Sequence, residues 1–135
     1  MRKKDQIAEL VKKHFSPGIA SNIIHQVNSH VEDDNKVLFF QIVQEGNDLK
    51  LEIALNEDTT IRDLVFRSTS FQFCALRYDA ITSIRFDEDE KRAYLKLVTN
   101  GPAYLHYTSM APPSREMLKG FYKHVLYVYE QRRGL

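Results

Sequence analysis

The sequence predicts an α+β fold with two N-terminal helices, about seven short antiparallel strands and a C-terminal amphipathic helix. Apolar residues recur with helical spacing up to about residue 32. From residue 37 the period changes to two, in runs rich in β-branched and aromatic residues. Helical spacing returns after the break at 111–113 and continues to about residue 132. Strands joined by short connections pair antiparallel, and strands followed by a helix indicate α+β, not α/β.

Two helices are expected before residue 36. The first covers residues 3–15, and one of its faces carries Ile7, Leu10, Val11, His14 and Phe15. Ser16 is placed to cap the second helix, and Pro17 suits its first turn. This helix should run from about 17 to 32. Its apolar row is Ile19, Ile23, Val27 and Val31.

The strands begin with a β-hairpin, the strongest local signal in the chain. It consists of VLFFQIVQ (37–44), the turn EGND and LKLEIAL (49–55). In the second strand the alternation predicts that Lys50 and Glu52 point outward and the apolar residues inward. Five further strands are expected at 60–67, 70–78, 81–86, 92–99 and 103–109.

The final helix should begin near Ser114, which can cap it, and reach about Arg132. Its apolar residues cover about half of the helical circumference, and Tyr127 lies alone on the polar side. The length of 135 residues indicates one domain. We expect residues 1–35 to form a helical extension, and residues 36–135 to form the antiparallel sheet with its closing helix.

Residues 37–132 resemble the pleckstrin-homology-like fold, in which seven meandering strands are closed by one amphipathic helix. The resemblance is carried by the first hairpin, VLFFQIVQEGNDLKLEIAL, and by the helix SREMLKGFYKHVLYVYEQ. The segment YDAITSIRFDEDEKRAYLKLV is similar to the middle of such domains, where a short strand leads through a tight turn into a longer one. The resemblance therefore implies a barrel-like or sandwich-like sheet.

Family members that bind phosphoinositides use basic residues in and beside the first strand–strand loop. Here that loop is the acidic segment 44–48, and only Lys50 follows it closely. This departure argues against phosphoinositide binding. The resemblance then implies recognition of a protein or peptide, although a fold alone does not define a function.

Composition excludes several classes of protein. Nineteen basic and eighteen acidic residues give a net charge of +1, so no overall attraction to nucleic acid or acidic membranes is expected. The single cysteine, Cys74, excludes an internal disulfide and a cysteine-based zinc site, and its strand pattern suggests an interior or half-buried position. The charged N-terminus is no signal peptide, and no apolar run approaches membrane-spanning length. We therefore expect a soluble cytoplasmic protein.

No motif predicts catalysis, a metal site or a cofactor. The acidic run 87–90 lacks the spacers of a calcium loop and is interpreted as a solvated turn between two strands. His25 and His30 lie about 140° apart on a helix, too far around it to share a metal. The five glycines form no phosphate-binding pattern. Basic residues near both ends could together attract an anionic lipid or RNA surface.

The leading hypothesis is a non-enzymatic binding or assembly module that recognises a protein or peptide and self-associates. Recognition would use the outer face of the N-terminal helices or a sheet edge that accepts a strand. Tyr127 is expected to be exposed and available for such a contact. The alternative is a small enzyme or ligand carrier with a pocket between sheet and final helix, lined by Arg77, Tyr78 and His106. Contact with an anionic surface through the basic ends is the third hypothesis.

Overall fold

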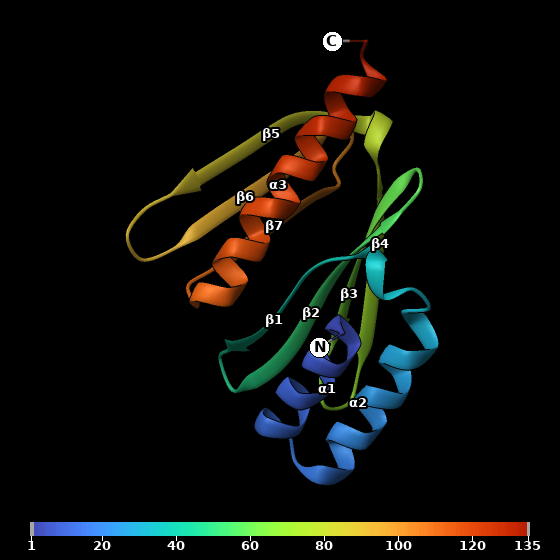
Figure 1. Cartoon of the computed structure of the whole chain (residues 1–135), viewed down its shortest axis with the longest axis vertical. Coiled ribbons are helices and arrows are strands. Elements are labelled where there is room, and N and C mark those ends of the chain that lie inside the picture. The colour runs from blue at the N-terminus through green and yellow to red at the C-terminus, as the bar shows by residue number, and fades with distance from the viewer. Residues whose placement is uncertain (1, 135) are drawn as a thin grey trace. The chain divides into compact units, whose positions relative to one another are not determined.

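The computed structural model describes residues 2–134, and in this part of the chain it contains three α-helices and seven strands (Figure 1). The predicted α+β class, the antiparallel strands and the C-terminal helix are confirmed. The elements in chain order are α1 (Lys3–His14), α2 (Pro17–His30), the 3-10 turn η1 (Asp34–Lys36), β1 (Val37–Glu45), β2 (Asp48–Glu57), β3 (Thr60–Phe66), β4 (Phe71–Arg77), the 3-10 turn η2 (Tyr78–Ala80), β5 (Ile81–Glu88), β6 (Ala93–Thr99), β7 (Tyr104–Ser109) and α3 (Pro112–Arg132).

The strands form two sheets in which sequence neighbours are also spatial neighbours. One sheet has the order β1-β2-β3-β4 and the other the order β5-β6-β7. Each sheet is therefore a simple antiparallel meander, as short connections require.

The chain divides into two compact units. The first contains the residues up to Leu55 together with Asp63–Cys74, and the second contains Asn56–Arg62 together with the residues from Ala75 onward. Strands β2, β3 and β4 each begin in one unit and end in the other, so the chain passes between the units three times.

In the first unit, α1 and α2 lie on one face of the four-stranded sheet (Figure 1). Their predicted apolar rows supply buried residues, among them Ile7, Val11, Ile23 and Val27. His14 was predicted to lie on the apolar face of the first helix, but it is exposed at the end of α1. Ser16 occupies the N-cap position of α2 as predicted, but its side chain makes no capping hydrogen bond.

The β1–β2 hairpin is closed by a two-residue loop in which Gly46 has a φ of +62°. A positive φ at the first central residue is typical of a type II′ turn, which matches the twist of paired strands. The expected alternation of β2 is wrong at Glu52, which is only 6% exposed. Its carboxylate accepts a 3.0 Å hydrogen bond from the Gln41 amide directly across the ladder, so this polar pair is satisfied inside the protein.

In the second unit, α3 packs on one face of the β5–β7 sheet (Figure 1). The Phe121 ring meets the Tyr107 ring edge-on with centroids 5.2 Å apart, and Tyr122 stacks on Phe86 at 4.6 Å. These rings explain why the apolar surface of α3 covers half of the helix. None of the helices within residues 2–134 combines the length and apolar character needed to cross a membrane.

The acidic run connects β5 to β6, as its position between two strand patterns predicted. The strand continues further than expected, through Glu88. That carboxylate lies 3.4 Å from Lys119 Nζ and 3.8 Å from the Arg115 guanidinium of α3, so it does not simply face water. Asp89 forms the turn itself, because its carboxylate accepts hydrogen bonds from the backbone N–H groups of Lys91 and Arg92. These two bonds outweigh desolvation and lower the pKa of Asp89.

Candidate functional site

Tyr78, one of the predicted pocket residues, belongs to the core of the second unit. It is 1% exposed, and its hydroxyl donates a 2.7 Å hydrogen bond to the side-chain oxygen of Asn56. The His124 ring lies edge-on at 6.3 Å and the Arg132 guanidinium 5.7 Å from the ring centroid. Burial raises the pKa of Tyr78 to about 12, although the Arg132 charge acts in the opposite direction. This hydroxyl is therefore a structural donor held away from bulk water.

Arg77 precedes Tyr78 and points to solvent. Its guanidinium donates two hydrogen bonds to Asp79, at 3.1 and 3.0 Å. These hydrogen bonds raise the pKa of Arg77 and lower the pKa of Asp79. Arg77 is thus occupied by a neighbouring carboxylate rather than directed at the Tyr78 hydroxyl.

His106 lies on the face of the β5–β7 sheet that points away from α3. Its neighbour Tyr107 packs against α3, and successive strand residues point to opposite faces. The His106 ring stacks on Tyr104 at 5.7 Å, and Lys96 is its partner across the ladder. The structure therefore does not bring His106 and Tyr78 together in a pocket between sheet and helix.

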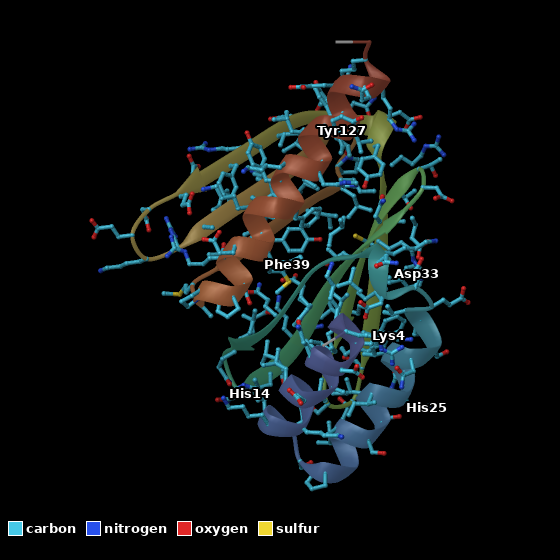
Figure 2. The ribbon with its side chains drawn as sticks, in the orientation of Figure 1. Lys4, His14, His25, Asp33, Phe39 and Tyr127 are labelled. Carbon is cyan, nitrogen blue, oxygen red and sulfur yellow. The ribbon has the colours of Figure 1, made fainter. Side chains whose placement is uncertain are left out.

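Tyr127 is exposed on α3, as predicted, with 63% of its surface accessible (Figure 2). It is the most isolated of the four predicted site residues. A single exposed aromatic side chain is common on protein surfaces and defines no site by itself.

Titratable side chains form no metal site in the part of the chain that is described: no group of three His, Cys, Asp or Glu residues is arranged to hold an ion within residues 2–134. His14 and His25 lie on opposite sides of the helical pair formed by α1 and α2 (Figure 2). His30 instead stacks on Phe71, with ring centroids 4.5 Å apart.

The terminal basic residues are engaged in local contacts. Lys3 Nζ donates a 2.7 Å hydrogen bond to the Val37 carbonyl in the first unit. In the second unit, Arg133 donates a 2.6 Å hydrogen bond to the Ile81 carbonyl and lies 4.4 Å from the Tyr129 ring centroid. These contacts hold the side chains of Lys3 and Arg133 against neutral groups of the protein and leave their charges unneutralised.

Strand β4 offers a different kind of site, the edge of a sheet. It is last in the order β1-β2-β3-β4, so β3 is its one strand neighbour among the described residues. Two backbone bonds fix the pairing: Arg67 N–H donates to Ser70 O at 2.8 Å and Tyr78 N–H to Thr59 O at 3.0 Å. Hydrogen-bonded pairs recur at every second residue of an antiparallel ladder. The backbone N–H and C=O groups of the even-numbered residues of β4 therefore point toward β3. The backbone groups of Phe71, Phe73, Ala75 and Arg77 point the other way, along the outer edge.

This edge is apolar and lacks the usual protection. From Phe71 to Leu76 the strand contains no charged residue and no proline. Phe73 is 61% exposed. Natural sheet edges commonly carry lysine, proline or a bulge that discourages pairing with another chain. An edge without these features is a template for an added strand.

Aromatic contacts hold the beginning of β4 in place. Phe71 stacks on Phe66 of β3 at 4.8 Å and on His30 of α2 at 4.5 Å. Phe73 continues the row, with its ring centroid 6.1 Å from that of Phe71. The exposed ring of Phe73 therefore belongs to a row of stacked rings.

Cys74 is exposed on the same strand, so its predicted interior or half-buried position is wrong. Partial desolvation, with a smaller contribution from the Asp63 carboxylate, raises the pKa of the thiol. A raised pKa keeps the sulfur protonated near neutral pH, which argues against a nucleophilic role.

The surface of the first unit has shallow hollows beside β4 and between α1 and α2. One, of about 520 Å³, lies along Asp63, Val65 and residues 71–74. The other, of about 430 Å³, lies between α1 and α2 beside Lys12, Pro17 and Ile24. The first coincides with the β4 edge, where backbone groups and an aromatic ring are available together. The β4 edge is therefore the candidate site.

Comparisons of the chain with protein-family models, with curated proteins and with solved structures found no match.

Phe73 and Cys74 are the residues that sequence reasoning missed. Their strand alternates regularly, which was interpreted as an interior pattern. The sequence feature that could have indicated this site is the uncharged run FQFCAL. Both faces of this strand carry apolar or neutral side chains, which fits an edge that another chain covers.

Proposed function

We propose that this protein is a non-enzymatic binding module that accepts an extended protein segment as an additional strand along β4. The observation that carries the proposal is the run Phe71–Leu76 of β4, which contains no charged residue and carries the exposed, stacked Phe73. The exposed thiol of Cys74 fits a reducing, cytoplasmic setting.

Strand addition would use the backbone groups that point along the outer edge of β4 in the first unit. Main-chain hydrogen bonds supply affinity in this mode of recognition, and pockets for alternate side chains supply specificity. Phe73 would cover the side chain of the added strand on one face. On the other face, the hollow beside Asp63 and Val65 would receive another side chain. Such a site recognises an extended backbone with apolar side chains, not a small molecule.

The pleckstrin-homology-like resemblance supports the same reading. The meandering order of all seven strands and the closing helix α3 agree with that fold. The β1–β2 loop is flanked by Glu45 and Asp48, the last residue of β1 and the first of β2, and the Lys50 ammonium lies 2.7 Å from the Glu45 carboxylate. A loop with its nearest cation already paired is poorly suited to a phosphoinositide, which leaves protein recognition as the proposed role.

A displayed library of random decapeptides, selected on the full chain, tests the proposal. We expect enriched peptides with alternating apolar residues whose binding is lost on Phe73→Lys. Tyr127→Lys is the matched control, because the Tyr127 ring is exposed to the same extent, 63% against 61%. Binding measured by fluorescence anisotropy should be unchanged in this control.

Peptides that bind the Phe73→Lys variant as well as the parent chain would contradict the proposal. Loss of binding in Tyr127→Lys alone would move the site to α3. Circular dichroism of both variants would confirm that neither exposed substitution disturbs the fold.

A further inference from the structure

We infer that the β5–β7 sheet binds single-stranded nucleic acid on the face that points away from α3, here called the outer sheet face. Bases would stack on Tyr94, Tyr104 and His106, and phosphates would contact Lys96 and Arg85. All of these residues belong to the second unit. The inference therefore goes beyond the proposed function, which concerns the edge of β4 in the first unit.

The register of the three strands arranges the outer sheet face in rows. Successive residues of a strand point to opposite faces, and residues on the α3 side, such as Leu95 and Tyr107, are buried. Their neighbours on the outer sheet face are exposed or half-buried. Each row takes one residue from β5, β6 and β7, and the rows are Asp87–Tyr94–Thr108, Arg85–Lys96–His106 and Ser83–Val98–Tyr104. The middle row thus carries three nitrogen-bearing side chains, with a tyrosine in the row on either side.

Three aromatic rings form a continuous row across this face. The His106 ring stacks on Tyr104 at 5.7 Å with 18° between the ring planes, and on Tyr94 at 6.4 Å with 28°. Tyr104 is 53% exposed, and His106 is exposed as well. Every nucleobase has a π face, so exposed rings on an open surface accept bases with little dependence on sequence.

The cations of the middle row repel each other in the free protein. Arg85 and Lys96 are direct partners across the ladder, and like charges in this position destabilise a sheet. Asp87 offsets part of the repulsion, because its carboxylate accepts the Nε–H of Arg85 at 2.8 Å. Lys96 has no carboxylate partner within residues 2–134, and its ammonium lies 5.6 Å from the Tyr104 ring centroid. An anion bound along the middle row would relieve the repulsion.

A hollow of about 450 Å³ next to the middle row can receive a phosphate group. It is flanked by Lys96 and Tyr94 and by the carboxylates of residues 87–89. Each carboxylate already has a basic partner: Arg85 for Asp87, Arg92 for Asp89, and Arg115 with Lys119 for Glu88. Because the carboxylates are compensated and Lys96 is not, the hollow favours an anion.

A single polynucleotide strand fits this surface better than an acidic protein segment does. Bases and phosphates alternate along the strand, as rings and cations interleave on the outer sheet face. An acidic segment would engage the cations and leave the rings uncovered. A duplex keeps its bases stacked inside the helix, where the rings cannot reach them. The attraction is local, so it agrees with a net charge of +1 for the whole chain.

Fluorescence anisotropy of a labelled uridine dodecamer mixed with the full chain is the experiment. We expect binding at low salt. The logarithm of the binding constant should fall against the logarithm of salt concentration with a slope of about −1.4, since two cations meet phosphates. Lys96→Gln should reduce this slope to about −0.7. Tyr104→Ala should weaken binding by about fivefold or more, because a stacking surface is lost. Tyr104→Phe keeps the π face and should bind as the parent chain does.

Tyr127→Ala and Lys123→Ala are the matched controls, because both side chains are exposed on α3 in the same unit. Neither substitution should change the affinity or the salt slope. Circular dichroism of every variant checks that the fold is retained. A thymidine dodecamer of DNA should also bind, and tighter binding of the RNA would indicate an additional contact to the 2′-hydroxyl groups.

No change in anisotropy at low salt would overturn the inference, and so would binding that Tyr104→Ala and Lys96→Gln both leave unchanged. Polyglutamate or duplex DNA that displaces the dodecamer at equal charge concentration would show that charge alone is recognised. That result would also overturn the inference and would favour an acidic protein partner. The decapeptides selected on the β4 edge depend on Phe73, so their binding reports separately on the proposed function.

Discussion

Asp34 fixes the beginning of α1 from outside the helix. Its carboxylate accepts hydrogen bonds from the backbone N–H of Lys4 at 2.7 Å and of Lys3 at 3.1 Å. These N–H groups belong to the first helical turn and have no acceptor within the helix. Desolvation opposes ionisation of Asp34, but the two backbone bonds outweigh it and lower the pKa of the carboxyl group. A residue 30 positions away thus performs the role of an N-cap.

We predict that Asp34→Ala lowers the free energy of unfolding by about 1 kcal/mol, as loss of a helix cap usually does. Because the folded-state pKa is depressed, this contribution is present above the unfolded pKa of about 4 and is lost as pH falls through the lower folded value. Urea denaturation at pH 7 and pH 3 measures both parts. Glu32→Ala, an exposed carboxylate nearby in sequence, is the control and should change stability little.

Tyr78 and Phe73 show what sequence alone can and cannot decide about single residues. Tyr78 was expected to offer its hydroxyl to a pocket but is buried, Cys74 was expected to be interior or half-buried but is exposed, and no prediction covered Phe73, which is exposed. Alternation shows which residues share a face of a strand. It does not show whether anything covers that face, because cover comes from elements distant in sequence. Tyr127 was predicted correctly, since the polar face of a long amphipathic helix usually meets water.

At the scale of elements, two glycines with similar surroundings should behave in opposite ways. A Cβ atom added at Gly46 or at Gly120 would meet nothing within 4 Å, so neither substitution creates a clash. Gly46 has a φ of +62° in the β1–β2 turn. Gly120 lies inside α3, where glycine costs backbone entropy.

We predict that Gly46→Ala destabilises the protein by about 1 kcal/mol through the left-handed conformation, whereas Gly120→Ala stabilises it by about 1 kcal/mol through helix propensity. Thermal denaturation of the two variants beside the parent chain measures both changes. Equal shifts in one direction would show that backbone conformation does not set the response at these positions.

Most elements were predictable because their periodicity is local. The helices at the N-terminus, the first hairpin and the C-terminal helix all appear within a few residues of their expected bounds. The extension of β5 to Glu88 was not predictable, since it depends on cations of α3 that lie 27 and 31 positions further along the chain. Burial of Glu52 likewise depends on Gln41 across the ladder. Long-range polar partners override a local pattern in both cases.

At the scale of the molecule, the interleaving of the two units has a thermodynamic consequence. The ladder formed by β2, β3 and β4 begins in one unit and continues in the other, so neither unit contains these strands whole. A strand that loses its pairing in one unit frays toward the other. We therefore expect the chain to unfold as one cooperative body.

Leu64→Ala in β3 and Leu97→Ala in β6 test this expectation, because both leucines are fully buried and lie in different units. Each substitution should cost about 2–5 kcal/mol. Hydrogen exchange should show protection of α2 and α3 falling together in both variants. Separate losses, of α2 in one variant and α3 in the other, would show two independent folding bodies.

The order in which residues enter the two units also bears on how the protein is made. Every residue of the first unit has been synthesised once Cys74 is added, while the second unit still lacks its three-stranded sheet and α3. Domains commonly fold as their residues leave the ribosome. In a chain that folds as one cooperative body, folding waits for the second unit, so the nascent chain exposes the uncharged run FQFCAL until α3 has been synthesised. Pausing of translation in this interval would lengthen the exposure of an aggregation-prone segment.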